Sequence, residues 1–258
     1  MSNIGSLAAA AGVALSLHSS GHPGLPKERV YQPKHKTPVG TVIDIHGGRW
    51  RASNNGIIDT DALFSIAMAK WGYKVVVPAF RGGRASLTDT RAVLNRELRR
   101  AHGKPVCLAG ESSGGSLALF LAASNSRVTC VISQAGPVNF NIAHPSPGDD
   151  YATITDAKRI WGARNGPVKS AGRTQAAVLL LNGAGDKTAP PARANGYVAR
   201  APHAANVTMR AGSTKWLHTR VNKASLTCAG NRAHALLNAA RRGRAAAWRA
   251  LGSRHQSC

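Results

Sequence analysis

The sequence LAGESSGGSLAL, residues 108–119, joins a strand pattern to a helix pattern through a serine. The apolar run Pro105–Gly110 predicts a strand, and Ser113–Ser124, rich in Leu and Ala, predicts a helix. Ser112 stands at the turn between them, in the centre of a GxSxG sequence. Such a turn needs small neighbours and presents its central hydroxyl at the helix N-terminus, where the dipole favours developing negative charge. The context indicates that Ser112 is a nucleophile. Its alternative role is a helix N-cap, for which serine is also favoured.

Alternating strand and helix patterns extend from this turn in both directions. Strands are predicted over Thr41–His46, Lys74–Phe80, Pro105–Gly110, Val128–Gln134, Ala176–Asn182 and Asn206–Arg210, and helices over Asp61–Trp71, Thr88–His102, Ser113–Ser124, Pro190–Ala201 and Ala233–Leu251. The strand runs are almost wholly apolar, which is expected where helices cover both faces of a parallel sheet. The pattern therefore predicts an α/β fold with a mostly parallel central sheet.

One stretch interrupts the alternation. Residues 137–173 are rich in Pro, Gly and Asn and contain one short predicted helix, Asp156–Trp161. A connection this long within a compact domain is usually functional, so we interpret it as a cap-like insertion. We expect residues 40–258 to form a single domain that includes it. The N-terminal lead, residues 1–39, is expected to be a weak signal segment or a poorly ordered segment.

The N-terminal apolar stretch Ile4–Leu17 has the length of a signal peptide, but its features are mixed. No Lys or Arg precedes it, and no clean cleavage site follows it. The compartment therefore stays open, with the cytoplasm as the default and secretion or the periplasm as alternatives. No apolar run approaches the roughly 20 residues of a membrane span, so no integral membrane association is expected.

The charge of the chain is strongly unbalanced. Its 258 residues include 34 Lys and Arg against 11 Asp and Glu, a net charge of +23, while a hydrophobic share of 43% excludes wholesale disorder. The segment from Ala229 to Cys258 contains six Arg and no acidic residue. One interpretation is surface composition without a role. The other is an anionic partner, either nucleic acid or an anionic polymer, although no zinc-finger spacing or aromatic RNA-binding motif accompanies the charge.

The four cysteines show no CxxC spacing, so we expect no metal site. Cys107 and Cys130 lie inside apolar runs, where a free cysteine acts as a small hydrophobic residue. Cys228 and Cys258 flank the Arg-rich C-terminal segment and could form a disulfide in an oxidising compartment.

A second glycine-rich turn follows the strand predicted over Thr41–His46. Gly47 and Gly48 come directly after it, and consecutive glycines let backbone N–H groups approach a substrate carbonyl oxygen. The N–H groups of Gly47, Gly48 and Ser113 are therefore the predicted oxyanion hole, with a simple Gly-Gly turn as the alternative. We expect His46 to orient this loop by hydrogen bonds and not to be the catalytic base.

With these motifs in place, the chain resembles the α/β-hydrolase superfamily. It looks most like the HGG-containing carboxylesterases related to hormone-sensitive lipase, and like prolyl-oligopeptidase-type serine hydrolases. The matching blocks are IDIHGGRW (43–50), GYKVVVPAFRGG (72–83), LAGESSGGSLAL (108–119) and LLLNGAGDKTAP (179–190). The resemblance covers about residues 40 to 220. The chain departs from the family at Arg49, where many relatives have a third Gly, and at Phe80, where Tyr is common.

The resemblance implies the order nucleophile, acid, histidine for the rest of the triad. Asp186 follows the strand Ala176–Asn182 and a glycine-rich turn, and a turn-forming Asp is its alternative role. His218 lies in a segment after the next strand and is the predicted base. His203 and His234 are the alternatives for that position.

These residues together predict a serine hydrolase that cleaves carboxylic esters through an acyl-enzyme, without a metal or organic cofactor. The substrate would be a small-molecule or polymeric ester. Trp50 and Trp216 are the candidate substrate-binding residues, with core or rim packing as their alternative. Arg49, Arg51 and Lys215, close to these elements in sequence, could bias the site toward anionic esters. The alternative functions are a peptidase of the prolyl-oligopeptidase type and a basic binding protein on a hydrolase fold.

Overall fold

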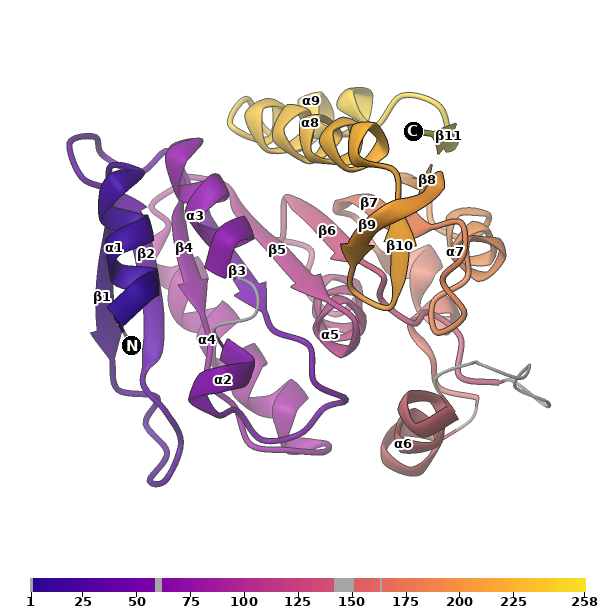
Figure 1. The fold of residues 1–258 in the computed structure, drawn as a ribbon, viewed down its shortest axis with the longest axis horizontal. Helices are drawn as coiled ribbons and strands as arrows, with labels where there is room; N and C mark the ends of the chain where they lie inside the picture. Colours follow the sequence, from indigo (N-terminus) through magenta and orange to yellow (C-terminus); the bar gives the residue numbers. More distant parts are fainter. Residues whose placement is uncertain (1, 59–61, 142–150, 163) are drawn as a thin grey trace.

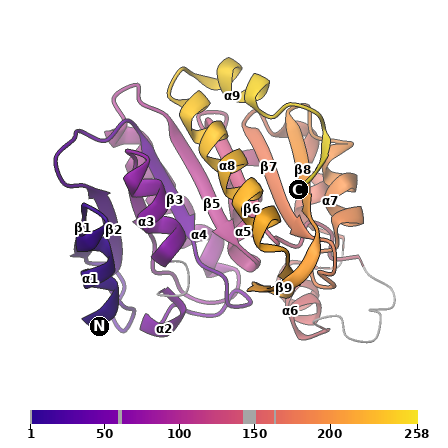
Figure 2. The same ribbon diagram turned by 45° about the horizontal axis from the view of Figure 1, so that its top comes forward.

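The computed structural model describes residues 2–58, 62–141, 151–162 and 164–258, and these build a large sheet with helices on both sides (Figures 1 and 2). The strands follow the order β1, β2, β4, β3, β5, β6, β7, β8, β11. Pairs from β4 to β11 are parallel, while β1 and β2 run antiparallel at one edge. The bounds are β1 Val13–His18, β2 Glu28–Pro33, β3 Thr41–Ile45, β4 Lys74–Val77, β5 Val106–Glu111, β6 Cys130–Gln134, β7 Ala177–Gly183, β8 Ala204–Met209 and β11 His255–Ser257. The predicted mostly parallel sheet is confirmed.

Helices cover the sheet on two sides, each over its own hydrophobic core. The first core is formed with α4 (Ala85–Arg100), α5 (Ser113–Ala123) and α7 (Pro191–Val198). The second is formed with α1 (Ser2–Ala10), α3 (Ala62–Lys70), α8 (Lys223–Ala240) and α9 (Arg244–Ala250). A short helix, α2 (Asn55–Ile58), precedes α3. The expectation of helices on both faces is therefore confirmed.

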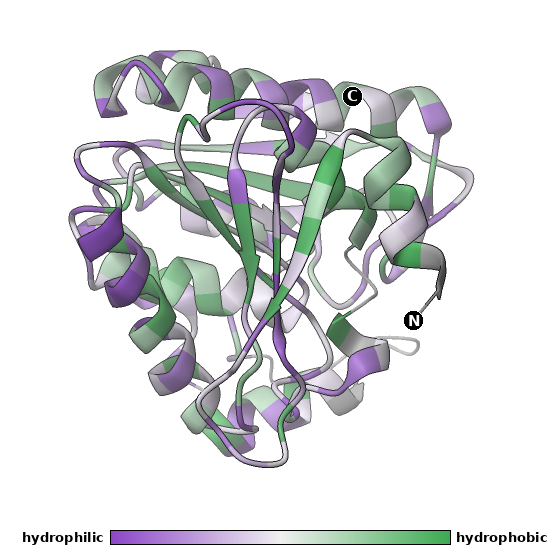
Figure 3. Cartoon of the chain, turned by 90° about the vertical axis from the view of Figure 1, so that its left-hand side faces the viewer, coloured by the Kyte–Doolittle hydropathy of each residue, from purple (hydrophilic) through white to green (hydrophobic). Residues whose placement is uncertain are grey.

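The two-sided covering explains why the central strands are almost wholly apolar. In β5, Leu108 belongs to the core under α4 and α5, while its neighbours Cys107 and Ala109 belong to the core under α8. Successive side chains of a strand point to opposite faces, so a strand covered on both faces has no polar side. Figure 3 shows hydrophobic residues along the central strands, and both hydrophobic and hydrophilic residues on the surrounding helices.

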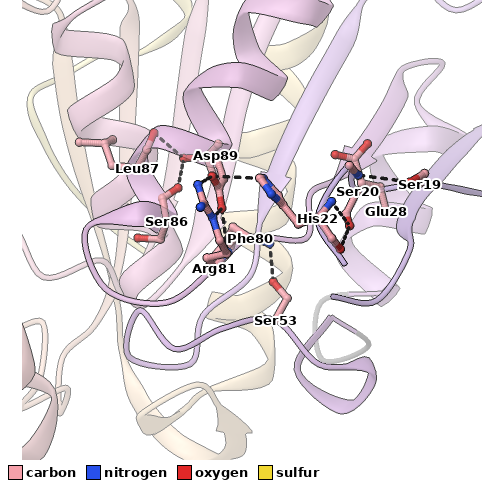
Figure 4. Close-up of polar contacts among 12 residues, drawn as sticks. Ser19, Ser20, His22, Glu28, Ser53, Phe80, Arg81, Ser86, Leu87 and Asp89 are labelled. Atoms are coloured by element: carbon pink, nitrogen blue, oxygen red, sulfur yellow. Dashed lines mark hydrogen bonds and ion pairs between the residues drawn. The ribbon is translucent and has the colours of Figure 1, made fainter. Parts of the chain in front are cut away.

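The N-terminal segment contains α1, β1 and β2, for which the sequence predicted no regular element. Both strands join the same sheet as the rest of the chain. In the β1–β2 connection, the imidazole Nε2 of His22 lies 3.3 Å from Asp89 of α4, which also pairs with Arg81 (Figure 4). The segment is therefore connected to the sheet by backbone pairing and to α4 through a side-chain contact.

The C-terminal segment differs from the single helix predicted over Ala233–Leu251. The chain instead forms α8, which begins ten residues earlier at Lys223, and the separate α9. Gly243, the N-cap residue of α9, stands between them with φ +98°, a non-helical backbone conformation that favours glycine. A small hairpin, β9 (Ala211–Trp216) and β10 (Thr219–Val221), was also not predicted.

The segment predicted as an insertion, residues 137–173, contains α6 (Tyr151–Trp161), which begins before the predicted Asp156. Ala157 and Ile160 of this helix pack into the core under α4 and α5. Two short 3₁₀ turns follow, at Pro167–Lys169 and Ala171–Arg173. Residues 142–150 and 163 of the segment lie outside the described residues.

All four cysteines form disulfides, so the expectation of free thiols at Cys107 and Cys130 is wrong. These two residues are register partners on the adjacent strands β5 and β6, and their Cα atoms are 4.7 Å apart, within the range that a disulfide spans. Cys228 bonds to Cys258, the pairing that the sequence left open. Among the described residues, no helix has both the length and the apolar composition of a membrane span.

Candidate active site

Ser112 lies at a tight turn between the end of β5 and the start of α5. Its backbone has φ +47° and ψ −121°, a conformation that non-glycine residues rarely adopt. Its N–H donates to the carbonyl oxygen of Gln134 in β6 at 2.8 Å, which fixes the turn against the sheet. A Cβ on Gly110 would lie 2.6 Å from the backbone carbon of Gly114, so the turn closes only around small residues. The strained serine and its glycine neighbours have the geometry expected of a nucleophile elbow.

His218 reaches this serine from the turn between β9 and β10. Its Nε2 lies 2.8 Å from the Ser112 Oγ, although the two residues are 106 positions apart in the chain. The preceding residue, Leu217, has φ +44°, so the hairpin turn is also locally strained. The other candidate histidines lie elsewhere: His203 stacks on Trp248 and His234 on Trp71. Of the three, only His218 hydrogen-bonds Ser112.

Asp186 follows β7 and lies on the other side of the His218 ring. Its Oδ2 is 3.3 Å from His218 Nδ1, and its Oδ1 accepts backbone N–H groups from Thr188 at 2.9 Å and Ala189 at 2.8 Å. The carboxylate is fully buried, whereas His218 is 19% exposed. A neutral imidazole that donates from Nδ1 to Asp186 leaves Nε2 free to accept the Ser112 proton. The structure thus brings the three predicted residues into one chain of hydrogen bonds.

The glycine turn after β3 runs directly against the serine. A Cβ on Gly47 would lie 3.3 Å from the Cβ of Ser112 and 2.9 Å from the Oε1 of Glu111, so a side chain here would require Ser112 and Glu111 to shift. Gly48 has φ +99°, again a conformation that favours glycine. Ser113 is the first residue of α5, and its N–H has no acceptor within the helix. All three predicted oxyanion donors therefore belong to backbone segments that lie next to Ser112 in space.

His46 is buried beneath this turn. Its Nδ1 donates to the Gly47 carbonyl at 2.7 Å, and its Nε2 accepts from the Ser53 hydroxyl at 2.6 Å. Ser53 in turn accepts the N–H of Phe80 (Figure 4), whose ring stacks on the imidazole. Burial lowers the pKa of His46 to about 4, against the hydrogen bond to Gly47, which raises it. A neutral ring held on both sides is suited to orienting the loop.

The predicted substrate-binding tryptophans differ in exposure. Trp50 is 1% exposed and packs edge-on against Phe140 and Trp161, so in this structure it is a core residue. Trp216 is half-buried at the end of β9, where it pairs with Thr219 across the hairpin.

The cations expected near the substrate also differ. Arg51 and Lys215 are exposed. Arg49 instead forms an ion pair with Asp156 of α6, so its charge is partly neutralised.

Two carboxyl groups near the site were not identified from the sequence. Asp44 of β3 is fully buried, its Oδ2 accepts from Ser65 at 2.6 Å, and its Oδ1 has no hydrogen-bond partner. Burial raises the pKa of Asp44 to about 7, Ser65 lowers it, and the charge of Glu111, next to Ser112, raises it. The available signal was an Asp within the otherwise apolar run TVIDI.

Within the described ranges, no three His, Cys, Asp or Glu side chains gather as a metal site would require.

No family model and no curated protein sequence matches the chain. Solved structures do match it. A putative dienelactone hydrolase from Klebsiella pneumoniae subsp. pneumoniae MGH 78578 superposes with a TM-score of 0.59 and 16% identity, over 86% of this chain and 95% of that one. A truncated carbohydrate esterase from gut microbiota gives 0.62 and 20% identity, over 77% and 87%. An arylesterase gives 0.56 and 16%, over 80% of each chain. The sheet order, the turn at Ser112 and these neighbours together show that the chain has the α/β-hydrolase fold.

Proposed function

We propose that this protein is a serine hydrolase that cleaves carboxylic esters through an acyl-enzyme intermediate. The observation that carries the proposal is the 2.8 Å contact between His218 Nε2 and the Ser112 hydroxyl, at a backbone position with φ +47°. Asp186 supports it from the other side of the imidazole. A nucleophile, a base within hydrogen-bond reach and a group that orients the base are the three requirements of nucleophilic acyl transfer.

In the first step, His218 Nε2 accepts the proton of Ser112 while Oγ attacks the ester carbonyl carbon. The carbonyl oxygen becomes an oxyanion that the N–H groups of Gly47, Gly48 and Ser113 stabilise. The buried carboxylate of Asp186 stabilises the imidazolium that forms, without itself taking a proton. Collapse of the intermediate expels the alcohol, which receives its proton from His218.

In the second step, water hydrolyses the acyl-enzyme. His218 accepts a proton from the water, the resulting hydroxide attacks the acyl carbon, and the same N–H groups hold the second oxyanion. The bond between the acyl carbon and Ser112 Oγ then breaks, and Oγ recovers its proton from His218. The residues return to their starting protonation states, so the cycle balances without a cofactor.

The names of two structural neighbours support an ester as the substrate. A carbohydrate esterase and an arylesterase share the fold over most of their own lengths. A preference for anionic esters would depend on the exposed Arg51 and Lys215, because Asp156 partly neutralises Arg49.

The decisive experiment compares the wild type with Ser112→Ala and with Ser126→Ala, an exposed serine just beyond α5. We expect a fluorophosphonate probe to label the wild type and Ser126→Ala but not Ser112→Ala. The kcat on p-nitrophenyl esters should fall by about 10⁴-fold or more in Ser112→Ala and stay within twofold in Ser126→Ala. A proline p-nitroanilide in the same panel tests the peptidase alternative. A folded wild type that neither labels nor hydrolyses any ester would contradict the proposal.

A further inference from the structure

The oxyanion loop, defined as residues 47–52, contains three successive residues with positive φ. Gly48 has φ +99°, Arg49 +60° and Trp50 +57°. The left-handed conformation is unfavourable for a non-glycine residue. Arg49 and Trp50 are therefore held in a conformation that the loop does not favour by itself, and contacts from outside the loop must stabilise it.

The side chains of both residues contact the inserted helix α6. Arg49 Nε lies 2.8 Å and its terminal nitrogen 2.6 Å from Oδ2 of Asp156, 107 positions away in the chain. The neighbouring indole of Trp50 packs edge-on against Trp161, with ring centroids 6.4 Å apart. Asp156 and Trp161 are both residues of α6. One helix thus contacts the loop at both residues that need support.

The ion pair is partly shielded from water, because Arg49 is 32% and Asp156 17% exposed. An ion pair in this setting is screened less than one on the open surface. Arg159 also approaches Asp156, at 3.4 Å from its other oxygen, but it is 72% exposed, and we expect such a pair to contribute little. The end of α6 is fixed separately, since Arg84 donates from Nε to the carbonyl oxygen of Ile160 at 2.7 Å. The helix is therefore a supported platform for the Asp156 carboxylate.

The oxyanion loop lies directly against the serine, so the contact with α6 affects the region around Ser112. The backbone of Gly47 is so close that a Cβ there would lie 3.3 Å from the Cβ of Ser112. Arg51 donates its N–H to the Gly48 carbonyl at 3.1 Å, so the residues around Arg49 form one compact turn. A change in the Arg49 backbone would therefore move the Gly47 and Gly48 N–H groups relative to Ser112.

We propose that Asp156 is a positioning residue. By holding Arg49, it keeps the Gly47 and Gly48 N–H groups where the oxyanion forms, and it makes the inserted helix α6 a part of the catalytic apparatus. This inference rests on the proposed serine-hydrolase function. Asp156 touches neither the substrate nor the reacting atoms. Its loss should affect the stabilisation of the transition state more than the binding of the substrate.

The test compares the steady-state kinetics of Asp156→Asn, Asp156→Glu and the matched control Arg159→Ala on a p-nitrophenyl ester. In Asp156→Asn the side chain keeps its shape and loses its charge, and we expect kcat to fall about tenfold while KM stays within twofold. Asp156→Glu should recover most of the rate. Arg159→Ala removes the exposed neighbour of the same carboxylate and should stay within twofold of the wild type. A KM increase with unchanged kcat in Asp156→Asn would instead indicate substrate binding and overturn the proposal.

A double-mutant cycle with Arg49→Gln measures whether Asp156 acts through Arg49, and the Arg49→Gln single variant tests the same contact if Asp156→Asn does not fold. We expect each single change to lower kcat and the double change to lower it no further. Additive losses, or equal losses in Asp156→Asn and Arg159→Ala, would overturn the proposal. Fluorophosphonate labelling of every variant keeps the two hypotheses separate. Wild-type labelling with an unchanged Asp156→Asn rate overturns only this inference, whereas an inert wild type overturns the proposed function and this inference with it.

Discussion

The carbonyl oxygen of Ile45 lies so close to Gly114 that a Cβ at position 114 would overlap it. Ile45 ends β3, which leads into the oxyanion loop, and Gly114 is the second residue of α5, after Ser113. The contact therefore fixes the distance between the two segments that carry the proposed oxyanion donors. Because the obstacle is backbone and not the end of a flexible side chain, rotation cannot relieve it.

We predict that Gly114→Ala destabilises the protein by about 3 kcal/mol or more, because the added methyl group forces β3 and α5 apart. Urea unfolding measures the change. Gly230→Ala in α8 is the matched control, since no atom lies within 4 Å of its added Cβ. That substitution should raise the free energy of unfolding by up to about 1 kcal/mol, as expected for Ala over Gly inside a helix. Similar effects at both positions would contradict the steric argument.

Asp186→Asn should reduce kcat by about 10³- to 10⁴-fold while the protein stays folded. The Oδ1 atom accepts two backbone N–H groups, from Thr188 and Ala189, so the asparagine places its oxygen there. Its amide NH₂ then faces His218 Nδ1 and stabilises the tautomer that carries the proton on Nε2, which cannot accept from Ser112.

The control for that prediction is Asp89→Asn. Asp89 is also a buried aspartate with a cationic partner, Arg81, but it belongs to α4 and not to the hydrogen-bonded chain at Ser112. Its kcat should remain within twofold of the wild type even if the melting temperature falls. An equal loss of kcat in both variants would mean that general destabilisation, and not the imidazole tautomer, explains the effect.

Most of the core fold and the turn at Ser112 could be predicted because their signals are local. The β5–α5 turn consists of adjacent residues, and Asp186 closely follows an apolar run, whereas His218 was assigned from the order of residues that the family resemblance implies. The hairpin that carries His218 has no local signal of its own. Most residues of β9 are exposed, and β10 is only three residues long, so no hydrophobic periodicity marks either strand.

Other features depend on contacts that a single sequence does not contain. Cys107 and Cys130 pair because β5 and β6 are neighbours in a particular register, and register is set by the assembled sheet. The Arg49–Asp156 ion pair joins segments that only the folded chain brings together. The break between α8 and α9 is not evident from the sequence, because Gly243 lies among helix-favouring Ala and Arg residues.

The pH dependence of stability should reveal the buried carboxyl of Asp44. Burial raises its pKa to about 7, so between pH 4 and pH 7 the folded protein holds a proton that the unfolded chain has released. The free energy of unfolding contributed by this group is therefore highest below pH 4 and falls as the pH rises to 7. Asp44→Asn removes the titration and keeps an oxygen that can accept from Ser65.

We therefore expect the stability of Asp44→Asn relative to the wild type to increase by about 2 to 3 kcal/mol between pH 5 and pH 8. Urea unfolding at several pH values gives the difference directly. The comparison with the wild type is needed because the titration of His46 also changes stability. Burial lowers the pKa of His46 to about 4, so its contribution to the free energy of unfolding increases as the pH rises. A difference that stays constant from pH 5 to pH 8 would show that Asp44 titrates normally.

The two disulfides should differ in their reaction with a mild reductant. Cys107 and Cys130 are fully buried, whereas Cys228 and Cys258 are partly exposed. Exchange requires a thiolate to reach a sulfur atom, so dithiothreitol should open Cys228–Cys258 first in the folded protein. Timed alkylation followed by mass spectrometry identifies which cysteines have been released.

Opening Cys228–Cys258 should lower stability by about 3 to 4 kcal/mol, the chain-entropy value for a loop of about 30 residues, and leave the sheet intact. Cys258 also donates its N–H to Thr208 at 3.0 Å and accepts from Ser225, so β11 keeps its pairing with β8 after reduction. The double variant Cys228→Ser/Cys258→Ser should show the same loss of stability in urea unfolding. A low dose of reductant should not lower its stability further. Equal rates of release at all four cysteines would instead require that the central strands open as readily as the C-terminal segment, which the complete burial of Cys107 and Cys130 argues against.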